Sequence, residues 1–200
     1  MQPVIYHDFH VLVEVRPDLN LDQLHLLHLE HPAERLNKTW RVTPSEEECD
    51  QIDTNPFPHL KDVFSSVDSD VGFNIEVKYP MKMKDGTHEC PAYIERNDFV
   101  DVILRNVLES AGKRRVIFSS FDPDVCTLIA LKQHIYPVMF LVIGTTKRYV
   151  PFQNASPLRS AEKFNLVKFV WGDDLNIKKN VEFFRELHVD GVIYDRQVYW

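Results

Sequence analysis

Six short apolar runs constrain the fold of this chain more than any other feature of its sequence. They lie at residues 3–6, 72–79, 115–121, 137–144, 166–171 and 191–194. Each run is rich in β-branched and aromatic residues, which is typical of β-strands. Because the apolar residues are mostly continuous, we expect strands that are covered on both faces, as in a parallel sheet whose crossovers are helices.

Helical patterns separate most of these runs. Asn97 can cap a helix that stops at Gly112, and Asp122 followed by Pro123 is typical of a cap and first helical turn. The predicted helices lie between residues 97 and 112, and at 122–133, 158–164 and 176–188. Strands and helices therefore alternate from residue 72 onward, which predicts parallel pairing with right-handed crossovers and an α/β architecture.

Two polar stretches interrupt this alternation. Residues 35–58 contain the acidic run Glu46–Glu48 and end in Asn-Pro-Phe-Pro, so we predict a long insertion or loop there. A second polar excursion covers residues 81–91. The sequence shows no internal repeat, and we expect a single domain over residues 1–200 with the insertion at about 35–58.

Charge and cysteine usage narrow the possible partners and location. The chain has 30 acidic and 23 basic residues, a net charge of −7, which argues against binding to a nucleic-acid backbone. Its three cysteines are odd in number and lack metal-site spacing, so we expect a reducing compartment and a cytoplasmic location. The apolar runs are too short to span a bilayer, and no basic-then-apolar leader is visible, so we expect no membrane insertion. The oligomeric state stays open.

Polar residues follow several predicted strands, where the loops of a (β/α) barrel would form an active site. In the segment Asn-Ile-Glu-Val-Lys, alternation places Asn74, Glu76 and Lys78 on one face of the strand. A carboxylate and an ammonium sharing a concave interior would suit a metal or an anionic substrate. The alternative is an edge strand with a solvated polar face. For Asp122 and Asp173, helix capping is the simpler interpretation.

Histidines give weaker signals. His7 beside Asp8 is a candidate acid/base group, because imidazole can exchange a proton near neutral pH. A three-residue repeat of histidines invites a metal-site interpretation, but such steps drift around a helix and no Glu or Cys completes the set. These histidines are His25, His28 and His31. Cys126 lies in an apolar helical pattern and is most simply a small buried hydrophobe.

Taken together, five segments resemble the glycerophosphodiester phosphodiesterase family, and most closely its animal cytosolic glycerophosphocholine phosphodiesterases. They are Pro-Val-Ile-Tyr-His-Asp (3–8), Gly-Phe-Asn-Ile-Glu-Val-Lys (72–78), Arg-Val-Ile-Phe-Ser-Ser-Phe-Asp (115–122), Val-Trp-Gly-Asp-Asp (170–174) and Asp-Gly-Val-Ile-Tyr-Asp (190–195). The resemblance implies a TIM barrel that hydrolyses glycerophosphodiesters to glycerol 3-phosphate and an alcohol such as choline. Its expected partner is this small phosphodiester.

The resemblance also implies roles for four residues. His7 would be one of two acid/base histidines, Glu76 a ligand of Mg²⁺ or Ca²⁺, Lys78 the catalytic cation that faces the phosphate, and Trp171 a substrate contact at the barrel mouth. A hard cation prefers carboxylate oxygen, and a lysine supplies a point charge where negative charge is held.

Several family features are missing from this sequence. The family's His-Arg and Glu-x-Asp pairs are absent, which removes two of three expected carboxylate ligands and predicts weak metal binding. The region at residues 150–158 is also short. We therefore expect an incomplete TIM barrel with about six of eight strands, truncated at its N-terminus and shortened internally, which is inactive or weakly active alone. The alternatives are a non-catalytic interaction or regulatory protein derived from that barrel, and a phospholipase-type barrel acting on membrane lipid.

Overall fold

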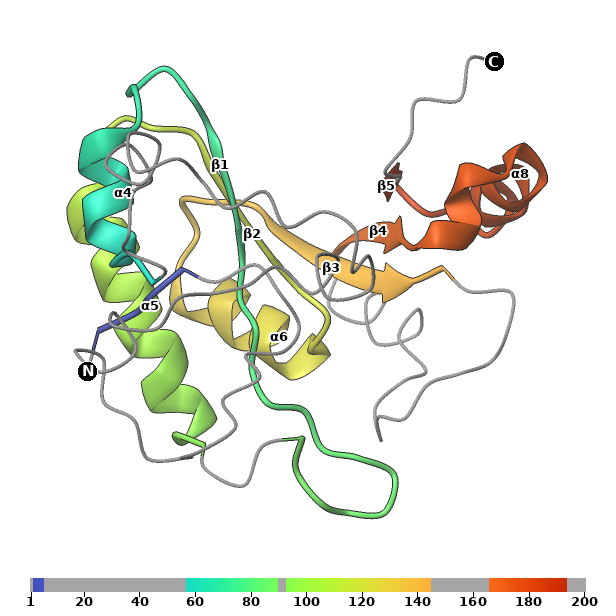
Figure 1. Ribbon diagram of the computed structural model, residues 1–200, viewed down its shortest axis with the longest axis horizontal. Coiled ribbons are helices and arrows are strands. Elements are labelled where there is room, and N and C mark those ends of the chain that lie inside the picture. The colour runs from blue at the N-terminus through green and yellow to red at the C-terminus, as the bar shows by residue number, and fades with distance from the viewer. Residues whose placement is uncertain (1, 6–56, 90–92, 145–165, 194–200) are drawn as a thin grey trace, which may run out of the picture. The chain divides into compact units, whose positions relative to one another are not determined.

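The computed structural model describes residues 2–5, 57–89, 93–144 and 166–193 (Figure 1). The chain forms two compact units, residues 1–66 and 67–200. In the first unit, Val4 and His59 form an isolated antiparallel bridge, and helix α4 spans Leu60–Ser66. The predicted first strand at residues 3–6 is described only at residues 3–5, where it forms a bridge and no ladder. Helix α4 was not predicted from the sequence.

The second unit contains a parallel β-sheet. Its strands are β1 (Phe73–Glu76), β2 (Val116–Ser120), β3 (Val138–Ile143), β4 (Val167–Trp171) and β5 (Gly191–Ile193). Every neighbouring pair is parallel, and the strands follow one another in sequence order, β1-β2-β3-β4-β5 (Figure 1). These strands confirm five of the six predicted runs and the α/β class. Sequential order is that of a (β/α) barrel wall, whereas doubly wound sheets reverse their order at a switch point.

Helices cross over between the strands. They are α5 (Arg96–Ser110), α6 (Pro123–Lys132), the 3₁₀ helix η1 (Asp173–Asn176) and α8 (Lys178–Glu186). Right-handed crossovers between sequential parallel strands place successive helices on the same face of a sheet. Helix α6 packs on β2 and β3, and its buried Cys126 Sγ lies 3.5 Å from the carbonyl oxygens of Ser120 and Met139. No helix in the described residues is long and apolar enough to cross a membrane.

The helix ends match the predictions in part. Asp122 caps α6 as predicted, accepting hydrogen bonds from the backbone N–H groups of Asp124 (2.8 Å) and Val125 (3.3 Å). Asn97 is not a cap, because α5 begins one residue before it, after Glu95. The residue before η1 is Gly172, so Asp173 is not a cap either but the first residue of η1. The predicted helix at 176–188 is confirmed as α8, which is shorter at both ends, and the extended residue Ile177 separates it from η1.

The pairing register sorts the strand side chains into two faces, because paired residues of parallel neighbours point the same way. One face packs against the helices and holds the fully buried side chains of Phe118, Phe140 and Val170. We call the other the site face. Its members are Asn74, Glu76, Ile117, Ser119, Met139, Leu141, Ile143, Val167, Phe169, Trp171, Gly191 and Ile193.

Burial differs between the strands. Residues 138–142 of the central strand β3 are buried on both faces, as predicted. Other strands are not: Asn74 and Glu76 are exposed in the edge strand β1, and Val167 is 39% exposed in β4. The prediction of cover on both faces was therefore wrong for β1 and for the first residue of β4.

A buried arginine ties the turn before β1 to β2. Arg114 donates from Nη1 to the carbonyl oxygens of Asp68 and Val71 and from Nη2 to that of Val67 (2.7 Å). Its guanidinium also lies 4.3 Å from the ring centroid of Phe73, the first residue of β1. A planar group with five donors can bridge several carbonyls at once, so Arg114 fixes where β1 begins.

We predict that Arg114→Met destabilises the fold. The substitution keeps the apolar stem but leaves three carbonyls without this donor, and hydrogen bonds from charged donors contribute about 1.5–3 kcal/mol each, so we expect a loss of roughly 2–4 kcal/mol in urea unfolding. The adjacent Arg115 is exposed, and Arg115→Met is the matched control, expected to stay within about 0.5 kcal/mol of wild type. Equal losses for the two variants would contradict the bridging role.

Candidate active site

The ends of the parallel strands bring polar and aromatic side chains to one edge of the sheet. Glu76 is the last residue of β1, Ser120 the last of β2 and Trp171 the last of β4. Glu76 is paired with Ser119 and Trp171 with Ile143, so Glu76 and Trp171 share the site face. The carboxyl edge of parallel strands is where (β/α) folds place their active sites.

The predicted alternation around Glu76 and Lys78 is confirmed. Val77 is buried, whereas Glu76 and Lys78 on either side of it are exposed. The Val77 N–H donates to the carbonyl oxygen of Ser119 at 2.7 Å, so strand pairing continues one residue beyond β1. Glu76 and Lys78 therefore emerge on the same side of the sheet. β1 is an edge strand of the described sheet. The exposure of Glu76 and Lys78 therefore also agrees with the alternative from the sequence, an edge strand with a solvated polar face.

Two buried neighbours hold the backbone of Lys78 in place. On one side, the Val77 carbonyl oxygen accepts a hydrogen bond from Ser120 Oγ at 2.7 Å. On the other side Tyr79 is buried, and its hydroxyl donates to the Ile94 carbonyl oxygen at 2.8 Å. Because both flanking residues are fixed on the covered side, the exposed Lys78 side chain must leave from the opposite side.

Arg96 joins the starts of α5 and α6 behind this edge. Its guanidinium lies 5.0 Å from the ring centroid of Tyr79, and Nη2 lies 3.3 Å from the Asp122 carboxylate. Nη1 binds Asp124 at 2.9 Å. No local signal in the sequence marks this cluster, since Arg96 and Asp122 meet only through the packing of two helices. The clue that was available is the position of Arg96 directly before one predicted helix and of Asp122 at the start of the next.

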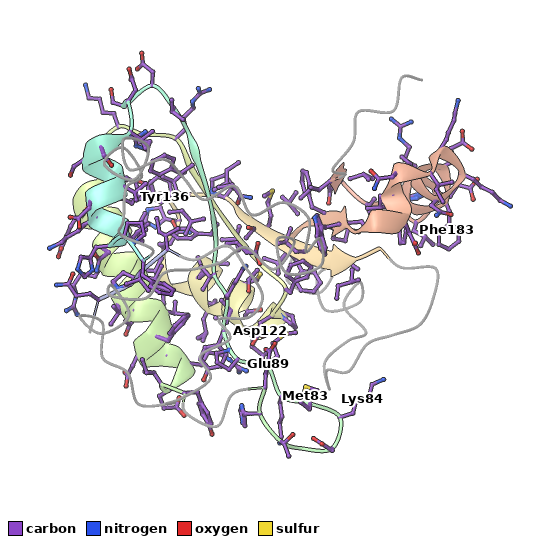
Figure 2. The ribbon with its side chains drawn as sticks, in the orientation of Figure 1. Met83, Lys84, Glu89, Asp122, Tyr136 and Phe183 are labelled. Carbon is purple, nitrogen blue, oxygen red and sulfur yellow. The ribbon has the colours of Figure 1, made fainter. Side chains whose placement is uncertain are left out.

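Burial has a measurable effect on Asp122. It raises the pKa of this carboxyl above its ordinary value of 3.8, outweighing the Arg96 guanidinium and the two backbone N–H donors, which lower the pKa. Asp122 is therefore a structural cap that carries an unfavourable charge, and it lies at the start of α6 (Figure 2).

Trp171 is held at the end of β4 by two contacts. Its ring packs edge-on against Phe121, with centroids 6.1 Å apart, and its carbonyl oxygen accepts from the Gly144 N–H at 2.7 Å. A Cβ on Gly144 would lie 2.4 Å from Val170 Cγ1, so a residue without a side chain is needed there. The aromatic pair of Phe121 and Trp171 links the ends of β2 and β4.

The loop at residues 81–89, which follows β1, projects away from the strands (Figure 2). An isolated bridge between Lys82 and His88 closes it, and Met83 and Lys84 lie in its outer part (Figure 2). This loop corresponds to the predicted polar excursion at residues 81–91, of which residues 81–89 are described.

Several predicted positions lie outside the described residues. These are His7 and Asp8, the histidines 25, 28 and 31, the cysteines Cys49 and Cys90, the insertion at 35–56, the helix at 158–164, and Asp195 at the end of the last segment that resembles the family. Of the predicted metal and acid/base residues, the structure thus places Glu76 alone. The described residues contain no group of three or more His, Cys, Asp or Glu side chains that could hold a metal ion. A carboxylate suits Mg²⁺ or Ca²⁺ chemically, but one such ligand is an incomplete donor set.

Cys126 is confirmed as a buried residue of α6. Burial raises its pKa to about 12, with the nearby Asp122 charge acting in the same direction. The thiolate is the reactive form of cysteine, so Cys126 is chemically inert in the folded protein.

We predict that Asp122→Asn changes how stability depends on pH. A raised folded-state pKa means that the folded protein holds a proton which the unfolded chain releases, so the wild-type free energy of unfolding falls as pH rises from about 3.8 through the raised pKa. The Asn variant keeps a cap acceptor and lacks this component. Urea titrations across this pH range measure the difference, and a wild-type advantage that grows with pH would contradict the burial of this charge.

We also predict that iodoacetamide at pH 8 does not modify Cys126 in the folded chain, because almost none of the thiol is ionised or accessible. Peptide mapping would show labelling only after denaturation in urea. Rapid native labelling of Cys126 would contradict the packing of α6 on β2 and β3.

Comparison with known proteins identifies the family. Residues 1–158 match the glycerophosphoryl diester phosphodiesterase family. The GPCPD1 homolog 1 of Caenorhabditis elegans is 43% identical over 257 residues, covering 98% of this chain, and human glycerophosphocholine phosphodiesterase GPCPD1 is 34% identical over 246 residues, covering 99%. Glycerophosphocholine phosphodiesterase gde1 of Schizosaccharomyces pombe is 44% identical over 111 residues, 54% of this chain and 10% of its own length.

The alignments cover almost all of this chain but only part of each relative. The chain spans 37% of the length of the Caenorhabditis elegans and human proteins. An alignment over 257 residues exceeds the 200 residues of the chain, so it contains gaps on this side. The fold order, the strand-end residues and these matches agree: the chain belongs to the glycerophosphoryl diester phosphodiesterase family.

Proposed function

We propose that this protein hydrolyses glycerophosphodiesters, such as glycerophosphocholine, to glycerol 3-phosphate and an alcohol. The observation that carries the proposal is the pair of exposed side chains, Glu76 and Lys78, on one side of the carboxyl edge of a sheet with barrel order. Family membership supports the same reaction class. The substrate would be a small molecule, and a cytoplasmic location agrees with the free thiol of Cys126.

Lys78 is proposed to hold the phosphate. An ammonium group is a compact charge that attracts the phosphodiester, and it stabilises the negative charge that builds up on the phosphoryl oxygens. The hydrogen bond from Ser120 Oγ to the Val77 carbonyl oxygen and the buried, hydrogen-bonded Tyr79 support this role, because together they fix the backbone from which Lys78 projects.

Glu76 is proposed to supply an oxygen ligand to Mg²⁺ or Ca²⁺, and without the two other carboxylates of the family pattern this cation would be held weakly. When bound, such a cation neutralises phosphoryl charge and polarises the phosphorus. Trp171 would contact the substrate from the far side of the same edge. His7 would exchange the proton between the nucleophile and the leaving alkoxide.

A non-catalytic interaction or regulatory protein is the second candidate. One observation favours it: the alignment with the Caenorhabditis elegans relative is longer than this chain and therefore has gaps in it. A barrel wall that lacks part of its ligand set could keep its fold and its partners while losing turnover.

Choline release from glycerophosphocholine separates the two candidates. With Mg²⁺ or Ca²⁺ added, we predict activity that falls about 100-fold or more in Glu76→Gln and in Lys78→Met, since each removes a group that stabilises transition-state charge. The matched controls are Glu109→Gln and Lys113→Met, exposed residues at the far end of α5 and just after it, which should retain wild-type rates.

Circular dichroism and thermal unfolding must show that each variant is folded. Full activity in Glu76→Gln or Lys78→Met would overturn the assigned roles. A folded wild-type chain without detectable release under either cation would instead favour the non-catalytic candidate.

A further inference from the structure

Two adjacent serines at the end of β2 have opposite environments. Ser120 points to the helix face, where its hydroxyl donates to the Val77 carbonyl oxygen (2.7 Å) and accepts from the Asp122 N–H (3.2 Å). Ser119 points to the site face and is also fully buried. Within the described part of the chain, its Oγ has no hydrogen-bond partner.

A buried hydroxyl without a partner destabilises a fold, because it gives up hydrogen bonds to water and receives none in return. The sheet does not need this side chain. Ser119 contributes to the ladder through its backbone, whose carbonyl oxygen accepts from the Val77 N–H at 2.7 Å. An alanine at this position could make the same backbone bond, so the hydroxyl calls for an explanation other than sheet stability.

The strand register shows what the hydroxyl can reach. Ser119 is paired with Glu76 on β1 and with Met139 on β3, and both neighbours lie on the site face. Adjacent strands are about 4.8 Å apart, which a glutamate side chain can span. Of these two neighbours, only Glu76 offers a strong acceptor, since a thioether sulfur accepts hydrogen bonds weakly.

We propose that Ser119 is a positioning residue, whose hydroxyl donates a hydrogen bond to the Glu76 carboxylate when substrate is bound. This inference rests on the proposed function. An exposed glutamate has several accessible rotamers, and a hydrogen bond from a rigid buried donor selects one of them. Side chains of unliganded sites commonly form their working hydrogen bonds only in the complex with substrate, which accounts for the unpartnered Ser119 Oγ within the described residues.

Ser119→Ala tests the role, with Ser120→Ala as the matched control. We expect Ser119→Ala to have a melting temperature equal to or above that of wild type, because it removes an unpaired buried hydroxyl, and Ser120→Ala to melt lower, because it breaks two hydrogen bonds. In the choline-release assay Ser119→Ala should lose about 10- to 100-fold in kcat, since a displaced catalytic group costs this much. KM should stay nearly unchanged, because Lys78 still binds the phosphate.

Each outcome decides between specific possibilities. A stable Ser119→Ala variant with reduced kcat supports the positioning role, and a purely structural role would instead lower the melting temperature. An active wild type whose Ser119→Ala variant keeps full kcat overturns the inference and leaves the proposed function intact. An inactive wild type overturns the proposed function for this chain and the role of Ser119 with it.

Discussion

Parallel pairing in strict sequence order is the constraint on which the second unit depends. When each strand pairs with the next one along the chain through a right-handed crossover, the helices gather on one face and all strands end at one edge. The register then decides which side chains share the site face: Glu76, Ser119 and Trp171 do. The set of side chains that share the site face therefore depends on the strand order and on the alternation of side chains along each strand, more than on any single motif.

Buried polar contacts at the carboxyl edge of the sheet fix the backbone around Lys78. Ser120 connects Val77 to the start of α6, Asp122 caps that helix, and Arg96 links Asp122 to Tyr79. Lys78 lies between two residues held by this set. Such a network keeps the backbone rigid where side chains must act, and it tolerates the unfavourable buried charge of Asp122 because Arg96 and the helix N–H groups offset part of it.

The sequence predicted local structure well where one signal dominated. The apolar runs that became β2 to β5 and the Asp122-Pro123 start of α6 have strong local patterns. Helix α4, the real start of α5 and the exposure of β1 depend on tertiary packing, which local patterns do not report. In the site, alternation identified the side shared by Glu76 and Lys78. Ser119 was recognised only as part of the polar segment that closes the strand at 115–121, because its pairing with Glu76 is a tertiary contact that local patterns do not report.

Ser119 lies on the site face between Glu76 and Met139, and nuclear Overhauser effects measured on the full chain by NMR test this placement. We expect cross-peaks from the Ser119 β-protons to side-chain protons of both strand partners, and from the Ser120 β-protons to α6. Cross-peaks from Ser119 to Cys126 or Ile129 of α6 would show that the register is shifted by one residue, and would contradict the account.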